Sequence, residues 1–445
     1  MAQNQENLME KIVSFAKRRG FIFQSSEIYG GFSSCYDYGP LGVELKNNVK
    51  RAWWKSMVQD NNDIVGLDTS ILMAPKVWEA SGHLGAGFTD PMAECKKCHK
   101  RFRPDKLEDQ KKCPECGGEL TEAKQFNLMM KTFIGPVEDT AAAAYLRGET
   151  CQGIYVNFEN VREAMRMKIP FGIAQIGKAF RNEITPGNFT FRMREFEQME
   201  MQYFINPKNK KEHFKKWQEA RMNWYHEYGM DKKKLKFYEQ KEDELAHYSS
   251  AAFDIEYEFP FGQDELEGIH DRGDWDLSNH AKHSGKDLQY FDDETKEKYF
   301  PHIIETSAGA DRSTLAFLVD AYDIVEGGRT KTTESNKEQE VVLRLDKRLA
   351  PIKIAVLPLS KKEELNKPAR ELFDELKKHW MAQYDVTGSI GRRYRRQDEI
   401  GTPYCVTFDF DTLEDKAVTV RDRDTMEQER VKMGDLVHYF KEKLD

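Results

Sequence analysis

Charged and aromatic residues alternate with apolar ones along positions 177–204. The segment predicts two antiparallel strands joined by a loop that contains Pro186 and Gly187. With a period of two, Arg181 and Glu183 share one face of the first strand. The matching face of the second strand carries Arg194, Phe196, Gln198, Glu200 and Gln202, and the other face carries Met199, Met201 and Tyr203.

The polar face of this hairpin combines groups that could hold a long, charged ligand. Two arginines beside an aromatic ring can bind phosphates bidentately and stack a base. Glu200 lies four residues beyond Phe196, about 13 Å along the same face at ~3.3 Å per residue, where a carboxylate can hold an ammonium group. That length suits an aminoacyl adenylate, although a hairpin whose polar face is simply solvated would show the same alternation.

A second segment, 301–322, predicts a strand, a glycine turn and a helix. Glu305 and Ser307 share a face of the strand with Ile303, Gly309 lets the backbone approach a ligand, and Arg312 begins the helix. The buried face of the helix is expected to carry Leu315, Leu318, Val319 and Tyr322. Taken alone, such a turn is more often structural than functional.

Four of the seven cysteines form two pairs, Cys95 with Cys98 and Cys113 with Cys116, separated by 14 residues. Each CxxC directs two thiolates at one centre, and four soft ligands suit a tetrahedral zinc ion. Because four thiolates leave no open position, we expect a structural Zn²⁺ rather than a catalytic metal. Redox chemistry or disulfides fit poorly without a secretory signal. The default for Cys35, Cys151 and Cys405 is a small buried side chain.

The composition is that of a folded protein with several domains. The chain has 445 residues, of which 39% are hydrophobic and 32% charged, so two to four domains are expected. No apolar stretch approaches the roughly 18 residues of a membrane helix, and the N-terminus has the spacing of an ordinary helix. We therefore expect a cytoplasmic protein with no membrane partner.

The charge pattern limits the ways in which the chain could bind nucleic acid. A formal charge of −8 argues against coating nucleic acid through bulk electrostatics. Two local basic patches remain, one at 208–216 and one that comprises Arg392, Arg393, Arg395 and Arg396. Each patch could equally be a solvated charged face.

The pattern along the chain predicts a mixed α/β (α+β), multidomain fold. A first domain, 1–326, is interrupted by a zinc-ribbon insertion at 91–122 and a charged helical insertion at 208–244. Residues 327–340 have the polar, aperiodic composition of a linker. Residues 345–445 predict a small α/β domain with strands near 352–357, 404–410 and 418–420 and a helix that begins at Pro368.

The segments at 177–204 and 301–322 resemble motifs 2 and 3 of the class II aminoacyl-tRNA synthetases, in the form found in the homodimeric glycyl-tRNA synthetases. Residues 27–54 resemble motif 1, 146–158 the amino-acid-site strand, 268–280 a further substrate segment and 401–428 the anticodon-binding domain. The resemblance implies an antiparallel-sheet catalytic domain and ATP-dependent attachment of glycine to tRNA(Gly) through glycyl-adenylate. It also implies Mg²⁺ with ATP, and a homodimer whose interface includes the helix at 43–57, although Trp53 and Trp54 could equally be core.

The resemblance also implies roles for individual residues. Arg181 matches the arginine on the α-phosphate, Phe196 the ring on adenine, and Arg312 the arginine on the γ-phosphate, so Arg181 and Arg312 are the expected catalytic residues. The expected ATP-binding set adds Asn182, Glu183, Phe191, Arg192, Met193, Arg194, Glu195, Glu265, Leu266, Gly309, Ala310 and Asp311. The expected amino-acid set is Arg103, Glu149, Phe196, Glu197, Gln198, Met199, Glu200, Arg272, Glu305, Thr306, Ser307, Ala308 and Gly309.

Two departures from the family pattern fall near the expected amino-acid pocket. Where the family usually reads RPETAQG, this chain has Gly148 in place of proline and Cys151 in place of alanine. Neither change removes a charged contact. We therefore expect the two changes to affect the rigidity of the pocket more than the activity. Three other interpretations stay open: a class II enzyme for threonine, proline or histidine, an inactive tRNA-binding relative, and a zinc-ribbon nucleic-acid binder.

Overall fold

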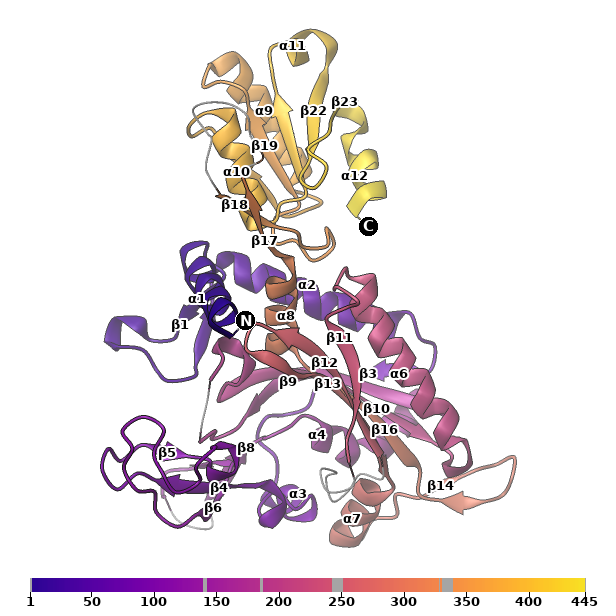
Figure 1. The fold of residues 1–445 in the computed structure, drawn as a ribbon. Coiled ribbons are helices and arrows are strands. Elements are labelled where there is room, and N and C mark those ends of the chain that lie inside the picture. Colours follow the sequence, from indigo (N-terminus) through magenta and orange to yellow (C-terminus); the bar gives the residue numbers. More distant parts are fainter. Residues whose placement is uncertain are drawn as a thin grey trace.

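The computed structural model describes residues 2–138, 142–184, 187–241, 251–327, 329 and 339–444. Its elements form a larger unit around a seven-stranded sheet and a smaller unit around a five-stranded sheet (Figure 1). Pro186 of the expected hairpin loop and most of the expected linker lie outside the described residues. Within the described ranges, no helix has the length and apolar composition needed to cross a membrane.

The seven-stranded sheet positions both segments that carry charged groups. Its order is β11-β12-β13-β16-β10-β9-β3, and every neighbouring pair is antiparallel except β3 with β9. The bounds are β3 Ile64–Gly66, β9 Phe171–Phe180, β10 Glu195–Ile205, β11 Leu235–Glu239, β12 Ala251–Phe259, β13 Gly262–Gly273 and β16 His302–Gly309. The predicted antiparallel hairpin is confirmed as β9 and β10, in which Phe196 pairs with Ala179.

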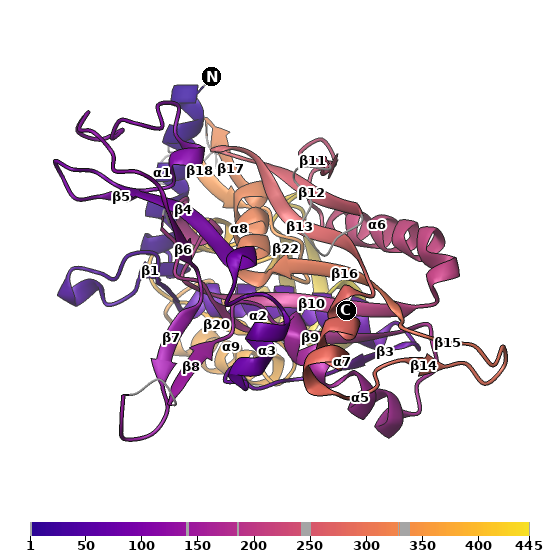
Figure 2. The ribbon, with the colours of Figure 1, turned by 90° about the horizontal axis from the view of Figure 1, so that it is seen from below.

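The two faces of the sheet differ as the alternation predicts. Met199, Met201 and Tyr203 belong to the main core, together with side chains of the surrounding helices. These helices are α1 Ala2–Arg18, α2 Pro40–Trp54, α6 Lys210–Glu227 and α8 Ala310–Ala321. By alternation, Gln198 and Glu200 lie on the opposite face. That face lies toward α4 Cys151–Val156 and α7 Trp275–Ser284, and Figure 2 shows α7 against the sheet unit. The main core therefore lies on one side of the sheet, and Gln198 and Glu200 lie on the other.

The glycine turn expected between strand and helix at 301–322 is absent from the structure. Strand β16 ends at Gly309 and α8 begins at Ala310, with Gly309 as the N-cap residue at φ −75°. Any residue can adopt this φ, so the direct junction between β16 and α8 does not require glycine for its backbone conformation. The strand and the helix are confirmed, and Leu315 and Leu318 are fully buried as expected.

Residues 86–133, here called the ribbon arm, project from the larger unit (Figure 1). They contain the 3₁₀ turn η3 Ala86–Phe88 and strands β4 Thr89–Glu94, β5 Arg101–Phe102, β6 Lys124–Asn127 and β7 Met130–Phe133. Strand β7 pairs with β8 Ala143–Leu146. One small cluster of buried side chains in the ribbon comprises Ala93, Cys95, Phe102, Cys113 and Leu120, with Cys98, Leu107 and Cys116 packed against it.

The charged stretch at 208–244 is helical over only part of its length. Helix α6 covers Lys210–Glu227, and Leu235–Glu239 forms β11, the edge strand of the main sheet. Gly229, at φ +87°, ends the helix and turns the chain back toward the sheet. The stretch therefore includes a strand of the catalytic-domain sheet, because pairing with β12 outweighs local helix propensity. Residues 242–244 lie outside the described ranges.

The smaller unit is a mixed five-stranded sheet, in the order β20-β19-β21-β22-β23. Its elements are β19 Ile354–Pro358, α9 Glu363–Leu376, β20 Ala382–Tyr384, α10 Ile390–Ile400, β21 Tyr404–Phe408, α11 Asp411–Asp415, β22 Ala417–Asp422, β23 Gln428–Lys432 and α12 Leu436–Leu444. Pro368 lies inside α9 and does not begin it, because the preceding turn already starts at Glu363. The basic run near 392–396 forms α10, a helix that the sequence pattern did not predict.

Strands β17 Tyr322–Glu326 and β18 Gln339–Leu343 pair with each other between the two units. The last two residues of the expected linker, 339 and 340, therefore belong to a strand. The remaining short elements are β1 Ile22–Gln24, β2 Tyr36–Tyr38, α3 Pro75–Ala80, α5 Phe158–Met165, β14 Tyr290–Phe291 and β15 Lys298–Tyr299.

Candidate active site

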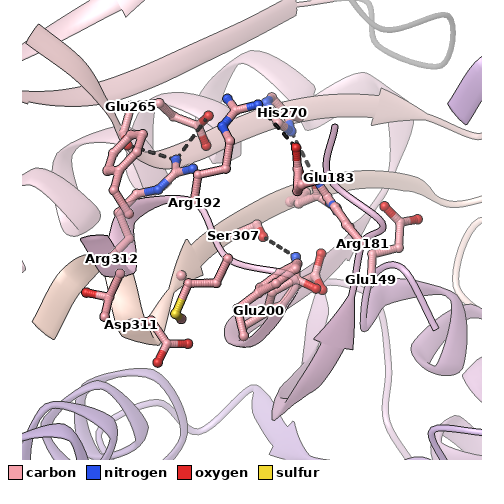
Figure 3. Close-up of a pocket in the computed structure, with 18 residues that line it drawn as sticks. Glu149, Arg181, Glu183, Arg192, Glu200, Glu265, His270, Ser307, Asp311 and Arg312 are labelled. Atoms are coloured by element: carbon pink, nitrogen blue, oxygen red, sulfur yellow. Dashed lines mark hydrogen bonds and ion pairs between the residues drawn. The ribbon is translucent and has the colours of Figure 1, made fainter. Parts of the chain in front are cut away.

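A cavity of about 310 Å³ opens on the polar face of the seven-stranded sheet (Figure 3). Its walls come from the β9–β10 hairpin, β13, β16, the start of α8 and the segment before α4. The lining residues are Glu149, Arg181, Glu183, Thr190, Phe191, Arg192, Met193, Phe196, Gln198, Glu200, Glu265, Gly268, His270, Glu305, Ser307, Gly309, Asp311 and Arg312. Residues from distant parts of the sequence therefore share one site.

Three arginines line one part of this cavity. The Arg181 guanidinium lies 5.5 Å from the centroid of the Phe196 ring, and its Nε donates to the carbonyl of Gly148 at 3.1 Å. Arg312 Nη1 donates to the Glu265 carbonyl at 2.8 Å, and its guanidinium lies 4.1 Å from the Phe191 ring centroid. Arg192 Nη1 lies 3.5 Å from a Glu183 carboxylate oxygen. This arrangement of cations and rings suits phosphates and a base.

Three carboxylates line another part, of which Glu200 and Glu305 are buried and Glu149 is partly buried. Glu305 accepts hydrogen bonds from His270 Nδ1 at 2.8 Å, from Gln202 Nε2 at 2.8 Å and from Arg272 Nη1 at 3.1 Å. Glu200 accepts from the Thr150 hydroxyl and from Gln202 Nε2.

The third carboxylate, that of Glu149, lies 3.2 Å from His83 Nε2 and accepts from the Cys151 thiol at 2.9 Å. The Cys151 sulfur and carboxylate oxygens of Glu200 and Glu305 all lie within 4.8 Å of one another. Acceptors this close together suit a small cation.

The surroundings divide these carboxylates into two charge states. Burial opposes ionisation of Glu305, but Arg272 and His270 lower its pKa to about 2. Burial likewise opposes ionisation of Glu149, yet His83 and Arg272 hold its pKa well below the ordinary value. Glu200 is different, because burial and the negative charges of Glu305 and Glu149 raise its pKa well above the ordinary value. Of these three carboxyl groups, Glu200 is therefore the one whose ionisation the surroundings oppose, and a bound cation would favour that ionisation.

Comparison with known proteins identifies the family. Residues 136–322 match the tRNA synthetase class II core domain (G, H, P, S and T), and residues 353–443 match the anticodon binding domain. The glycine–tRNA ligase of Thermobifida fusca is 53% identical, over 98% of this chain and 98% of its own length. The glycine–tRNA ligase of Treponema denticola is 55% identical, over 97% of this chain and 96% of its own length. The chain belongs to the glycine–tRNA ligase family.

Membership of the glycine–tRNA ligase family resolves two of the alternatives that the sequence left open, the enzyme for another amino acid and the zinc-ribbon nucleic-acid binder. The class II core family also includes enzymes for four other amino acids, but the relatives that match along nearly the full chain are glycine–tRNA ligases. A zinc-ribbon nucleic-acid binder would account for only the ribbon arm. The cavity is thus the candidate active site of a glycine–tRNA ligase.

The structure brings most of the residues expected for such a ligase to the cavity wall. Five others have core-facing side chains, because strand alternation and helix packing turn them away from the cavity. These are Met199, Leu266, Thr306, Ala308 and Ala310, each at most 1% exposed.

Several charged residues of the expected set instead form pairs beside the cavity. Glu197 binds Lys46 and Lys50, and Glu195 binds Lys178. Arg103 is 2.7 Å from both Asp90 and Asp105, and Arg272 is held by Asp276 at 2.7 Å and by Glu305.

Asn182 donates its backbone N–H to Leu128, and Arg194 donates to the carbonyls of Ser33 and Glu183. Asp311 lines the cavity but is paired with Lys46 at 2.6 Å.

Sequence reasoning missed two histidines of the site. His270 lines the cavity, and His83 contacts Glu149 from behind. A signal for His270 was present, because Gly268, His270 and Arg272 alternate along one strand and so face one way. No local pattern indicates His83, since its contact with Glu149 depends on how α3 packs against the sheet unit.

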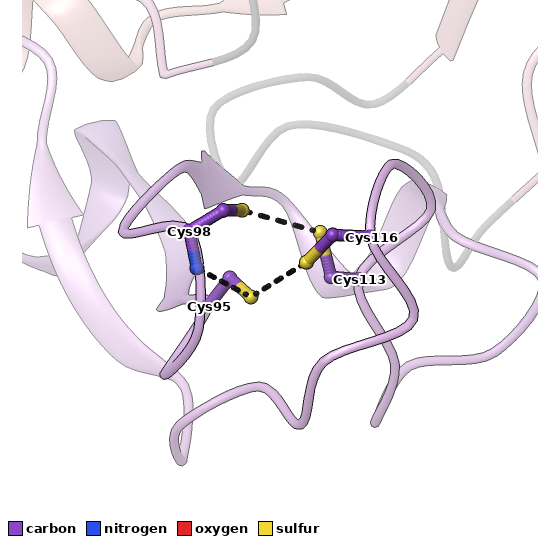
Figure 4. A group of neighbouring side chains, drawn as sticks. All are labelled: Cys95, Cys98, Cys113 and Cys116. Atoms are coloured by element: carbon purple, nitrogen blue, oxygen red, sulfur yellow. Dashed lines mark hydrogen bonds between the residues drawn. The ribbon is translucent and has the colours of Figure 1, made fainter.

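The four paired cysteines of the ribbon arm converge as their spacing predicts (Figure 4). The Cys95 and Cys116 sulfurs are 3.5 Å apart, and the Cys98 and Cys113 sulfurs are 3.7 Å apart. These distances are too long for disulfides, at about 2.05 Å. They are close to the roughly 3.7 Å that separates sulfurs in a tetrahedron with Zn–S bonds near 2.3 Å. The donor set therefore fits Zn²⁺.

Proposed function

We propose that this protein attaches glycine to tRNA(Gly) with ATP, through a glycyl-adenylate. One observation carries the proposal. In a chain of the glycine–tRNA ligase family, a single cavity joins three arginines to the clustered carboxylates of Glu149, Glu200 and Glu305. Arginines suit the phosphates of ATP, and carboxylates suit the ammonium group of an amino acid.

In the first step, a carboxylate oxygen of glycine attacks the α-phosphorus of ATP. The bond from that phosphorus to the bridging oxygen breaks, and pyrophosphate leaves. Arg181 stabilises the negative charge at the α-phosphate, and Arg312 binds the γ-phosphate. In the second step, a 3′-terminal ribose hydroxyl of the tRNA attacks the acyl carbon, and AMP leaves. No side chain acts as a covalent nucleophile.

Selection of glycine rests on exclusion. A substrate without a side chain offers no group to bind, so the enzyme must leave no room for larger ones. The close approach of Glu200, Glu305 and Cys151 around one point supports this reading. The two carboxylates also compensate the ammonium charge.

Two metal ions belong to the proposal. Mg²⁺ would enter with ATP and neutralise phosphate charge, and the Glu265 carboxylate, beside Arg312 at 3.3 Å, offers oxygen ligands of the kind it prefers. A structural Zn²⁺ would be held by Cys95, Cys98, Cys113 and Cys116 in the ribbon arm. Its contribution is to folding of the arm.

We further propose a homodimer, a cytoplasmic location and the domain limits expected from the sequence. The catalytic domain spans 1–326, with the ribbon at 91–122, and the anticodon-binding domain spans 345–445. The exposed side of α2 is the proposed dimer contact. It includes Val43, which is 40% exposed, whereas Trp53 is fully buried and belongs to the core.

The test is ATP–pyrophosphate exchange by purified protein, with glycine, alanine, serine, threonine or proline and without tRNA. We expect exchange with glycine alone, and Arg181→Ala is expected to abolish it without unfolding the protein. Exchange with another amino acid would overturn the pocket assignment. No exchange from folded, zinc-loaded protein would favour an inactive tRNA-binding relative.

A further inference from the structure

Phe88 lies outside both motif segments but contacts the arginine expected to bind the α-phosphate. It is the last residue of η3, at the base of the ribbon arm. The Arg181 guanidinium lies 5.3 Å from the Phe88 ring centroid, a distance similar to that from the Phe196 ring. Two aromatic rings and one backbone carbonyl thus contact this side chain.

Backbone hydrogen bonds fix Phe88 relative to the hairpin. The Leu128 N–H donates to the Phe88 carbonyl at 3.1 Å, and the Asn182 N–H donates to the Leu128 carbonyl at 2.8 Å. Asn182 directly follows Arg181, so this chain of bonds joins the ribbon arm to the end of β9. The ring also packs against the ring of His83, with centroids 4.6 Å apart.

Gly148 makes this packing possible. A Cβ atom at this position would lie 3.0 Å from two Phe88 ring atoms and 3.2 Å from the Met129 sulfur. The absence of a side chain lets the ring lie against the backbone whose carbonyl accepts from Arg181 Nε. Ring, carbonyl and guanidinium therefore form one packed group.

The surroundings of Arg181 differ from those of the other cavity arginines. Arg192 faces Glu183, and Arg312 faces Glu265. Within the described ranges, no carboxylate lies within 4.0 Å of the Arg181 nitrogens. Rings and a carbonyl can orient a cation without neutralising it. The full charge of Arg181 thus stays available to an anion.

We propose that Phe88 is a positioning residue for adenylate formation, because it holds the Arg181 guanidinium in place for the α-phosphate. This inference rests on the proposed function. It also gives the ribbon arm a role in the first chemical step, since the arm carries the ring.

The test compares two substitutions of Phe88 in glycine-dependent ATP–pyrophosphate exchange. Phe88→Leu removes the ring, and we expect kcat to fall about tenfold while KM for ATP changes less than about twofold. Phe88→Tyr keeps the ring and is expected to stay within about twofold of wild type. The matched control is Phe133→Leu, which removes a ring–cation contact with Lys131 on the same arm, away from the cavity.

A double-mutant cycle with Arg181→Lys makes the test specific. If Phe88 acts through the guanidinium, Phe88→Leu lowers kcat of exchange by less than about threefold in the Arg181→Lys background. Equal losses in both backgrounds, or equal losses for the Leu and Tyr variants, would overturn the inference. Thermal melting and zinc content check folding, and Phe88→Met replaces the Leu variant if that variant melts below the assay temperature. Wild-type protein without exchange would instead refute the proposed function.

Discussion

Glu200 and Glu305 lie on neighbouring strands, yet the structure shifts their pKa values in opposite directions. Glu305 has two cationic partners, Arg272 and His270. Glu200 has only neutral donors within hydrogen-bond distance. Burial raises the pKa of each, and the cationic partners reverse this effect only for Glu305. The ligand-free pocket therefore opposes ionisation of Glu200, and a bound ammonium would favour it.

Glu200→Gln is expected to raise the free energy of unfolding of the ligand-free protein near pH 8 while abolishing exchange, because it removes a carboxyl group whose ionisation the pocket opposes. The pKa of Glu200 is raised in the folded protein. Its contribution to the free energy of unfolding is therefore full below the unfolded pKa of about 4.3 and is lost as the pH rises through the folded pKa. Thermal melting between pH 5 and 8 would measure the difference. A pH dependence identical to wild type would contradict the assignment.

The matched control for Glu200→Gln is Glu305→Gln. The pKa of Glu305 is lowered to about 2 in the folded protein. Its contribution to the free energy of unfolding is therefore present above the unfolded pKa and is lost as the pH falls through the folded pKa. Removing its charge takes one carboxylate from His270 and one from Arg272, which keeps Asp276, so the free energy of unfolding is expected to fall at neutral pH. Opposite shifts in melting temperature for the two variants would separate the two charge states.

Cys151 is expected to restrict the amino-acid pocket. Its fully buried thiol donates to Glu149, and its pKa is raised by burial and by nearby carboxylates, so it stays protonated. We expect Cys151→Ala to raise alanine-dependent exchange relative to glycine, because one methyl group of space is worth about 1–3 kcal/mol in a tight pocket. Cys405→Ala, in the other unit, is the control. An unchanged alanine-to-glycine ratio would contradict the prediction.

At the scale of elements, the ribbon arm is expected to depend on its metal. Its core has five buried side chains, two of which are cysteines of the cluster, so little apolar burial remains without the ion. We expect one zinc per chain, and chelation should make the arm sensitive to limited proteolysis while the sheet unit resists. Cys35→Ser should keep the zinc, whereas Cys113→Ser should lose it. Equal protease resistance with and without metal would contradict this.

Helix α10 shows that most arginines of the second basic patch, Arg392 to Arg396, are neither free to contact nucleic acid nor fully solvated. Arg393 is buried and donates to the carbonyls of Pro358, Asp385 and Leu359, and Arg396 pairs with Asp385. Arg395 pairs with Glu340. Only Arg392 of the four is exposed. Most of the patch therefore holds the smaller unit together.

Arg393→Ala is expected to lower the free energy of unfolding by about 2–4 kcal/mol, because three buried carbonyls lose their donor. Arg392→Ala is expected to leave stability within ~0.5 kcal/mol of wild type. Denaturant unfolding of the two variants would measure both effects. A salt titration of tRNA binding by the Arg392 variant would then test whether that residue contacts phosphate, with an expected slope change of about one.

At the scale of the whole molecule, the proposed homodimer can be tested at α2. Val43→Arg places a charge on the exposed side of the helix, and it is expected to produce monomers if that side is an interface. Light scattering after gel filtration would measure the mass of wild type and variant. Leu359→Arg, at a similarly exposed residue of the smaller unit, is the control. A fully active wild-type monomer would contradict the dimer.

Much of the site follows from local sequence pattern. Alternation along 195–205 separates Glu200 from Met199, and CxxC spacing brings the four sulfurs together, because both depend on neighbours only a few residues away. The same local reasoning fails at 208–244, where pairing with β12 makes a strand of residues that read as helix. It also fails at α10, where buried partners determine the roles of the arginines.

The sequence by itself determined which residue types share a face and which segments carry the family motifs. Only the tertiary structure decided which of those groups are charged and which are held in place. Glu200 and Glu305 have the same side chain, but their pKa values shift in opposite directions. Residues distant in sequence place carboxylates around Glu200 and cations around Glu305. The ring under Arg181 comes from Phe88 on the ribbon arm. Such contacts depend on how the chain closes in space, which residue spacing along one segment does not encode.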